Sequence, residues 1–236
     1  MARCAACRAN RPIRWACACW RWWRKGFDRP DFRQHGAVNP RTPADIDFLA
    51  PSHEVAPRLI GLVLLVGGVG GRIVETEAYD REDPASHSFG GPTLRNAAMF
   101  GPPGRAYVYR SYGIHWCLNF VCREEGHGAG VLIRALAPTA GLERMRARRG
   151  VEDIRLLCAG PGRVAQALGV DAGFNGKRLD RPPFALLAAP DDHPAVVVEA
   201  GPRIGISKAA DVPWRFGEKG SPFLSKPFSR AKAQRA

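Results

Sequence analysis

One stretch of strand-forming residues constrains the fold more than any other part of the chain. Two β-prone runs, residues 62–66 and 72–79, flank a glycine cluster at 67–71, and this arrangement predicts a β-hairpin. Because side chains alternate along a strand, the second run divides into two faces. One face is small and branched, whereas the other carries two carboxylates and a phenol. The first face holds Val74, Thr76 and Ala78, and the second holds Ile73, Glu75, Glu77 and Tyr79.

The two acids of this run give it a candidate chemical role. Acidic and aromatic side chains in an apolar strand are typical of an active site, although a solvated sheet edge explains them equally well. The strand rise separates Glu75 and Glu77 by roughly 7 Å along the backbone, which is within the range of a glycoside hydrolase pair. The spacing alone does not decide which glutamate acts, or whether either of them does.

The composition of the chain indicates one sizeable domain and a polyanionic partner. Its 236 residues suffice for a stable core. A formal net charge of +13 and a pI near 10.0 make nucleic acid the first candidate partner. No secretory signal is visible, and no apolar run is long enough to span a membrane. We therefore expect a cytoplasmic protein of bacterial type with free thiols, which associates with the nucleoid when it works and does not bind membranes.

Residues 1–42 differ in composition from the remainder. They contain ten Arg and Lys residues against two acids, four of the six tryptophans, and the cysteines Cys4, Cys7, Cys17 and Cys19. Four thiolates can hold zinc, but this spacing matches no common site. We expect a disordered basic extension that adds non-specific affinity for nucleic acid. One domain is expected over residues 43–226, and a basic tail over residues 227–236.

The rest of the chain predicts further strands and three helices, the first of which is capped by Ser52 and runs through Val55 and Leu59. A second helix is predicted to begin at Pro138 and to run past Met145 with four arginines on one side, which either a solvated face or phosphate contacts would explain. Another is predicted from Gly160 to near Gly169, and the free amides at its start can hold a phosphate. Residues 171–194 are predicted to be mostly loop. Further strands are expected at residues 107–109, 114–122, 130–136, 196–199, 203–207 and 214–217.

Three features in these segments suggest contacts with a nucleic acid. The first is Tyr112, which is displayed between a serine and a glycine at a hairpin tip, where an aromatic ring can wedge into a base stack. The second is Arg134, which interrupts an apolar strand and needs an anionic partner, either Glu75, Glu77 or a phosphate. The third is a set of flat side chains that can sandwich a base removed from the helix, namely Tyr79, His87 and Tyr109.

Ten short motifs follow one another along the chain between about Phe48 and Ser225. They are Glu75-Thr76-Glu77-Ala78-Tyr79, Asp83-Pro84-Ala85-Ser86-His87-Ser88, Arg95-Asn96, Met99-Phe100, Tyr107-Val108-Tyr109, Tyr112-Gly113, Cys117-Leu118-Asn119, Leu132-Ile133-Arg134-Ala135-Leu136, Arg203-Ile204-Gly205-Ile206-Ser207 and Gly220-Ser221-Pro222. In this order and without large gaps, they resemble the motifs of the 3-methyladenine DNA glycosylases of the alkyladenine DNA glycosylase family. The resemblance is highly specific, and it leaves residues 1–42 uncovered.

The resemblance implies a DNA repair enzyme that flips an alkylated or deaminated purine out of duplex DNA and hydrolyses its N-glycosidic bond. By position, Glu77 matches the general base and Arg134 a basic residue beside it, while Tyr112 matches the wedge that fills the gap in the duplex. Glu75 has no counterpart role, so we expect it to form a structural pair. The implied substrate-binding residues are Tyr79, His87 and Tyr109, which stack around the base, and Asn119, which disfavours the amino group of guanine at the pocket floor.

The implied fold is α+β, with a single mixed domain around a curved, largely antiparallel β-sheet and flanking helices. This fold agrees with the hairpin-rich pattern of predicted strands. The implied substrate is duplex DNA containing damaged purines, and a polyanionic substrate of this kind also accounts for the basic charge of the chain. We expect the protein to act as a monomer.

The residues favour a monofunctional enzyme without a cofactor or a metal. Alkylation at N3 or N7 makes the base cationic, so one carboxylate and a positioned water suffice for hydrolysis. A Schiff-base mechanism needs an amine, and no lysine occurs between Lys25 and Lys177. No metal-binding motif is present. The alternatives are a non-catalytic damaged-base-binding protein, against which Glu77 argues, and a sugar-cleaving hydrolase, which explains neither the basic charge nor Tyr112.

Overall fold

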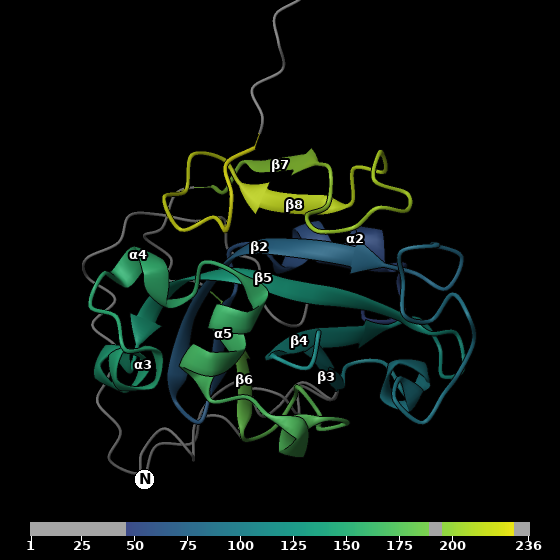
Figure 1. The fold of residues 1–236 in the computed structure, drawn as a ribbon, viewed down its shortest axis with the longest axis horizontal. Helices are drawn as coiled ribbons and strands as arrows, with labels where there is room; N and C mark the ends of the chain where they lie inside the picture. Colours follow the sequence, from purple (N-terminus) through teal and green to yellow (C-terminus); the bar gives the residue numbers. More distant parts are fainter. Residues whose placement is uncertain (1–45, 189–194, 229–236) are drawn as a thin grey trace, which may run out of the picture.

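The structure, a computed structural model, describes residues 46–188 and 195–228. It confirms the expected α+β class, because one domain is built around a curled antiparallel sheet with helices packed against it (Figure 1). The extension at 1–42, with the four cysteines considered for zinc, and most of the tail at 227–236 lie outside the described residues. The strands are β1 (Val63–Val66), β2 (Val69–Tyr79), β3 (Ala106–Ser111), β4 (His115–Cys122), β5 (Ala129–Ala140), β6 (Phe184–Leu187), β7 (Val198–Gly201) and β8 (Arg215–Glu218).

Strand β2 is the centre of the sheet. The strand order is β3-β4-β5-β2-β1-β6, and β8 pairs with the second half of β2 and carries β7 on its other side. Among the described strands, only β2 pairs with three others, and Figure 1 shows it running between β5 and β8. The helices are α2 (Ser52–Leu59), α3 (Leu142–Arg149), α4 (Ile154–Leu157) and α5 (Pro161–Leu168), with short 3₁₀ turns η4 (Ala97–Phe100) and η5 (Ala172–Phe174).

The predicted hairpin is present, but its turn is shorter than the glycine cluster. Gly67 and Gly68 form the turn with φ angles of 56° and 78°, which glycine adopts without strain. Gly70 and Gly71 belong to β2 instead. A side chain is excluded there because a Cβ on Gly71 would lie 2.1 Å from the carbonyl oxygen of Ala137 on β5. These two glycines therefore allow neighbouring backbones to approach closely.

The predicted faces of β2 are correct from Glu75 onward and wrong before it. Ile73 packs into the main hydrophobic core, whereas Val74 packs on the opposite face beside Phe223. The cause is a β-bulge, because residues 73–75 of β2 lie opposite only two residues of β5. A bulge adds one residue to a strand and so shifts the alternation of its side chains by one position. Sequence alternation alone does not reveal such a shift.

The structure also corrects several predicted element boundaries. Strand β5 continues through Pro138, so helix α3 begins at Leu142 rather than at the proline. Pro138 is tolerated because it lies opposite Gly71 at a second register shift, where a ladder hydrogen bond is dispensable. Residues 203–207 form no strand, and residues 184–187, predicted as loop, form β6.

Two arginines of helix α3 fasten it to the neighbouring helices. Arg148 donates from Nη1 to the carbonyl oxygen of Ala167 at 2.9 Å, and Arg149 donates from Nε to that of Leu157 at 3.1 Å. The acceptors lie at the carboxyl ends of α5 and α4, where helical carbonyls lack intrahelical partners. Neither a purely solvated face nor phosphate binding is needed to explain these two arginines. The predicted helix at 160–169 is confirmed as α5, with Pro161 in its first turn.

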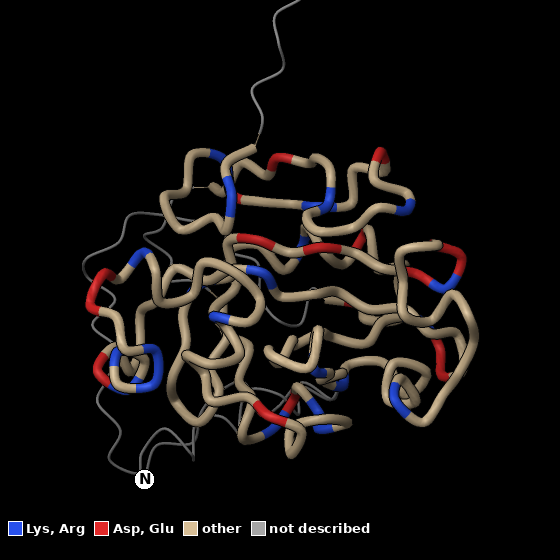
Figure 2. The backbone as a smooth tube through the Cα atoms, viewed as in Figure 1, with Lys and Arg blue, Asp and Glu red and all other residues tan. Residues whose placement is uncertain are grey.

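Charge is distributed unevenly between the surface and the sheet. Figure 2 shows most charged residues on loops and helices, but also acidic stretches on β2 inside the fold. The side chains of Glu75 and Glu77 are fully buried, so the solvated sheet edge considered above is wrong. Cys117, Cys122 and Cys158 are buried free thiols. Within the described ranges, no helix has the length and apolar character needed to cross a bilayer.

Candidate active site

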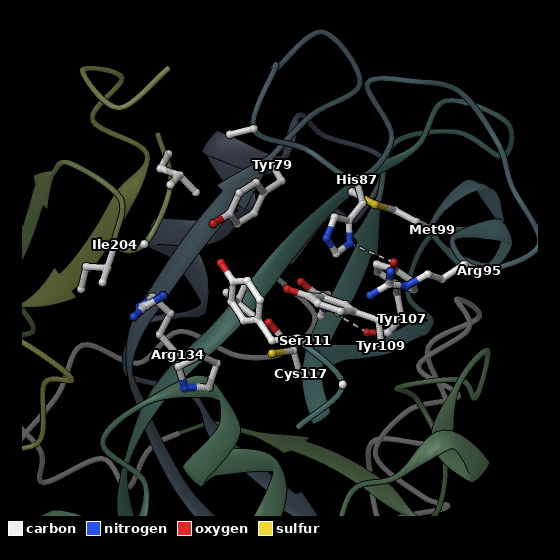
Figure 3. A pocket seen from close by; sticks show the side chains of 18 residues that line it. Tyr79, His87, Arg95, Met99, Tyr107, Tyr109, Ser111, Cys117, Arg134 and Ile204 are labelled. Carbon is white, nitrogen blue, oxygen red and sulfur yellow. Dashed lines mark hydrogen bonds between the residues drawn. The ribbon is translucent and has the colours of Figure 1, made fainter. Parts of the chain in front are cut away.

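A cavity of about 780 Å³ opens beside the second half of β2 (Figure 3). Its walls come from β2 to β5, the loop after β2, the start of α5 and the segment between β7 and β8. The predicted site residues on its walls are Tyr79, His87, Tyr109, Tyr112, Asn119 and Arg134. Glu77 is not on the surface of the cavity, because its carboxylate lies behind three residues that are: Tyr79, Arg134 and Ile204.

Each of those three residues donates a hydrogen bond to Glu77. The Tyr79 hydroxyl and Arg134 Nη1 donate to Oε2 at 2.9 Å and 3.0 Å, and the backbone amide of Ile204 donates to Oε1 at 2.7 Å. Burial raises the pKa of the Glu77 carboxyl, and Arg134 is the strongest of the neighbours that oppose this rise. The result is a carboxylate that is held rigidly, is poorly hydrated and binds protons more readily than an exposed glutamate.

The bulge in β2 is matched by a bulge in β5, and together they bring the acids and their arginine to one place. Glu75 pairs with Ala135 and Thr76 pairs with Ile133, so Arg134 is the extra residue on β5. Its side chain therefore turns toward the carboxylates rather than into the core, where Ile133 packs. Bulges of this kind re-aim side chains next to active sites. We call Glu75, Glu77 and Arg134 the carboxylate wall.

Glu75 accepts four hydrogen bonds and does not line the cavity. It accepts from Arg215 Nε at 2.7 Å and Arg134 Nε at 3.3 Å. Ser225 adds its backbone amide at 2.6 Å and its hydroxyl at 2.8 Å. This matches the expectation that Glu75 forms a structural pair. Arg134, whose partner the sequence left open, binds both acids, and the resulting attraction holds its pKa above the usual value despite burial.

Aromatic rings form the opposite side of the cavity. His87 and Tyr109 lie with their ring centroids 4.4 Å apart in an edge-to-face arrangement. Tyr107, which was not predicted, stacks on Tyr109 at 5.4 Å and lies at hydrogen-bond distance, 3.2 Å, from Nδ1 of His87. Because side chains alternate along a strand, the sequence already places Tyr107 and Tyr109 on the same face. Tyr107 could therefore have been predicted as a site residue. Figure 3 shows these rings facing Tyr79 across the cavity.

His87 is held in place by its own loop. Asn96 donates from Nδ2 to the carbonyl oxygens of His87 at 2.8 Å and Gly91 at 3.0 Å. Partial burial lowers the pKa of His87, and the guanidinium of Arg95, another residue of the cavity wall, lowers it further. The imidazole therefore stays neutral near pH 7, with one nitrogen directed to Tyr107 and the other free to contact a ligand.

Asn119 lies at the buried end of the cavity on β4. It is 5% exposed, and its Nδ2 donates to the carbonyl oxygen of Tyr107 at 3.1 Å. Cys117 and Leu132 are its neighbours on the cavity wall, and burial raises the pKa of the Cys117 thiol. A fixed amide in the wall of a cavity is a group that discriminates between ligands by hydrogen bonding.

Tyr112 lies at the mouth of the cavity, at the tip of the β3–β4 hairpin. Its side chain is 87% exposed and its φ angle is 49°, a left-handed conformation that costs about 1–2 kcal/mol for a residue other than glycine. Ile114 beside it is 66% exposed. We call residues 111–114 the hairpin tip. A strained and exposed aromatic side chain next to a cavity suggests a contact with a ligand.

The arrangement suits one kind of chemistry. A buried carboxylate stands beside a cavity walled by flat rings, so it can take a proton from water next to a flat ligand. In the described part of the chain, no lysine lines the cavity, and no group of three His, Cys, Asp or Glu side chains is placed to hold a metal.

Comparison with known proteins identifies the family. The model of the family described as methylpurine-DNA glycosylase (MPG) matches residues 46–222. A protein of Nitrosospira multiformis is 68% identical over 183 residues, which cover 78% of this chain and 93% of the relative; one of Rhizobium meliloti (strain 1021) is 55% identical over 189 residues, which cover 80% and 99%. Both carry the name "Putative 3-methyladenine DNA glycosylase". By this extent and identity, the chain belongs to the methylpurine-DNA glycosylase family.

Proposed function

We propose that this protein is a monofunctional DNA glycosylase that flips alkylated or deaminated purines out of duplex DNA and hydrolyses the N-glycosidic bond with a water activated by Glu77. One observation carries the mechanism, namely the buried carboxylate of Glu77 held by Tyr79, Arg134 and the Ile204 amide at the cavity. The family supplies the reaction class, since its members are DNA glycosylases for alkylated bases.

Glu77 has the bonding capacity that a general base requires. Among the described residues only Ile204 donates to its Oε1, and a carboxylate oxygen accepts two hydrogen bonds. The remaining position can accept a proton from water as that water attacks C1′ of the sugar. The C1′–N bond breaks and its electron pair leaves with the base, so a cationic 3-alkyl or 7-alkyl purine departs as a neutral molecule.

The rings of the cavity supply the binding surface for the flipped base. Tyr79 stands on one side and the His87–Tyr109 pair on the other, so a flat purine fits between them. Asn119 Nδ2 is a donor at the buried end. Because the 2-amino group of guanine is also a donor, the two groups cannot pair, and undamaged guanine is disfavoured.

The hairpin tip supplies the wedge. Flipping costs a few kcal/mol of unstacking and unpairing, and a ring inserted into the vacated space recovers part of that cost. Tyr112 is exposed at the cavity mouth and is held on a strained turn. The absence of lysine from the cavity wall, over the described residues, supports the monofunctional assignment. We further propose that the protein acts as a monomer.

A single product analysis tests this proposal. The protein is incubated with methylated duplex DNA and with a duplex carrying one hypoxanthine, and the free bases and strands are measured separately. We expect release of methylated purines, and a strand that stays intact until later treatment with alkali. Damage-specific binding without base release would favour the non-catalytic damaged-base-binding protein. Trapping of an enzyme–DNA adduct with borohydride would contradict the monofunctional mechanism.

A further inference from the structure

Arg203 is a buried charged residue to which the proposed mechanism assigns no role. It lies in the segment between β7 and β8, is 5% exposed and does not line the cavity. Its guanidinium forms a bidentate ion pair with the buried carboxylate of Asp83, in which one of the two bonds measures 3.0 Å. It also donates to the carbonyl oxygens of Ala78 at 3.0 Å and Ala209 at 3.3 Å. So many acceptors around one cation fix its position firmly.

The same guanidinium contacts two aromatic rings. Its Cζ atom is 4.8 Å from the ring centroid of Tyr79 and 5.5 Å from that of Trp214. Trp214 in turn stacks on His53 of helix α2, with a centroid distance of 5.1 Å and an interplanar angle of 3°. Tyr79 lines the cavity and Arg203 does not. The cation therefore holds Tyr79 through a cation–π contact without itself reaching the cavity.

Two further connections run from Arg203 to the rest of the site. The next residue in the chain, Ile204, donates its amide to Glu77 Oε1 at 2.7 Å. Asp83 accepts from the amide of Ala85 at 3.0 Å, and Ala85 is part of the cavity wall two residues before His87. Arg203 thus contacts the ring of Tyr79 and precedes the Ile204 amide that donates to Glu77. It is also paired with Asp83, which holds the loop that carries His87.

We propose that Arg203 is a positioning residue that holds Tyr79, the Ile204 amide and the loop bearing His87 in a single arrangement around the flipped base. The inference rests on the proposed function of the cavity, but it concerns a residue that touches neither the base nor the water. Its physical basis is that a planar guanidinium binds a carboxylate at its edge while it also contacts two aromatic rings. Lysine cannot reproduce this combination, because its ammonium is a single point charge.

Loss of this support acts on the chemical step. Small displacements of the groups that orient a reacting centre reduce rates steeply, and a shift of about 1 Å can cost about a hundredfold. Without Arg203, the Tyr79 ring, the Ile204 amide and the His87 loop each lose one constraint. The rate of base release in the bound complex should therefore fall even where the protein stays folded and still binds damaged DNA.

The experiment compares Arg203 with an arginine that forms a buried ion pair elsewhere on the same sheet. Arg72 of β2 binds Glu218 of β8 at 2.6 Å, with side-chain exposures of 11% and 16%, and neither residue lines the cavity. The variants are Arg203→Met, Arg203→Lys and the matched control Arg72→Met, all in the full chain. Single-turnover rate constants are measured on methylated duplex with enzyme in excess, at a temperature where circular dichroism shows every variant folded.

We expect Arg203→Met and Arg203→Lys to lower the rate constant by about ten- to a hundredfold, as for misplaced orienting groups. Arg72→Met should lower the melting temperature while leaving the rate constant within about twofold of the parent, because its ion pair with Glu218 does not line the cavity. A rate for Arg203→Lys within twofold of the parent, or an equal loss in Arg72→Met, would overturn the inference. Failure of the parent to release base would instead refute the proposed function. Should Arg203→Met fail to fold, Arg203→Lys and Asp83→Asn apply the same test.

Discussion

The carboxylate wall reaches the cavity through Arg134 and the hairpin tip through Tyr112, yet the two are held in different ways. The wall is buried, and its bonds join residues far apart in the sequence: 57 positions between Glu77 and Arg134, 127 between Glu77 and Ile204, and 150 between Glu75 and Ser225. The tip is exposed and is held by one short turn, in which the Ile114 amide donates to the carbonyl oxygen of Ser111 at 2.9 Å.

This difference separates two kinds of function. The wall is buried and held by many hydrogen bonds, which suits groups that must keep one geometry during a reaction. The tip projects a ring into solvent, which suits a group that meets its partner only when DNA arrives. Changes in the wall should therefore act on the rate of base release, and changes at the tip should act on binding. The following experiments test that division in order of decreasing effect.

The largest effect is expected from the wall residue Glu77. Glu77→Gln keeps the size of the side chain but removes the proton acceptor, so base release should fall by about 10²–10⁴-fold, the usual contribution of a general base. Binding of damaged duplex should remain close to that of the parent. Single-turnover excision and gel-shift affinity, measured on the same methylated duplex, separate the two quantities.

Glu75→Gln is the control for this variant, because Glu75 lies on the same strand face and shares Arg134 with Glu77. Removing one partner of a buried ion pair costs about 3–5 kcal/mol of stability, so the melting temperature should fall. At a temperature where the variant is folded, its excision should exceed that of Glu77→Gln by at least tenfold. If Glu75→Gln abolishes excision and Glu77→Gln does not, the roles assigned to the two acids are wrong.

A smaller effect is expected at the tip, and it should appear in binding. Tyr112→Ala removes the ring that replaces lost base stacking, which should weaken binding of a damaged duplex by ~1–3 kcal/mol. The loss should shrink when the lesion lies in mismatched or single-stranded DNA, where less stacking has to be replaced. Tyr112→Trp, which keeps a flat ring, should retain most of the affinity. Equal binding of the alanine variant and the parent to fully paired duplex would rule out the wedge.

The smallest effect is a displacement of the pH profile. Glu77 accepts a proton only when it is ionised, so base release should decline as the pH falls through its pKa. Because burial raises that pKa, the decline should begin at a higher pH than the pKa of an exposed glutamate. Single-turnover rates across the acidic range, with saturation by DNA verified at each pH, test this. A decline centred on the ordinary glutamate pKa would show that Glu77 is more hydrated than its burial indicates.

The same contrast explains what could be predicted from the sequence. The hairpin tip is a local feature: a serine and a glycine around Tyr112, between two strand-forming runs, suffice to predict it. The hairpin of β1 and β2 and the helix α5 were predicted for the same reason, since their glycines and the proline at 161 act on the nearest residues. Elements whose form is set by neighbouring residues in the sequence could thus be predicted without a structure.

The carboxylate wall was predicted only in part. The residues themselves singled out Arg134 and the two acids, and the resemblance to a family supplied their roles. The bond from the Ile204 amide to Glu77 and the ion pair of Arg203 with Asp83 were not predicted. Residues 203–207 were expected to form a strand, whereas they form an irregular segment that contributes a backbone amide to Glu77. The paired bulges at Val74 and Arg134 were also missed, because a bulge is a property of two strands in contact.

These paired bulges have a consequence for how the protein tolerates insertions and deletions. The bulge in β2 separates two portions of the strand whose side chains alternate in opposite phase. For this reason Ile73 packs in the hydrophobic core, whereas Glu75 and Glu77 do not. Deleting Val74 alone would close the bulge in β2 but leave Arg134 as an extra residue on β5, so the two strands would no longer match in length across the bulges. An insertion or deletion in this part of β2 should therefore be tolerated only when β5 changes length by the same amount opposite it. The two strands are expected to gain or lose residues together.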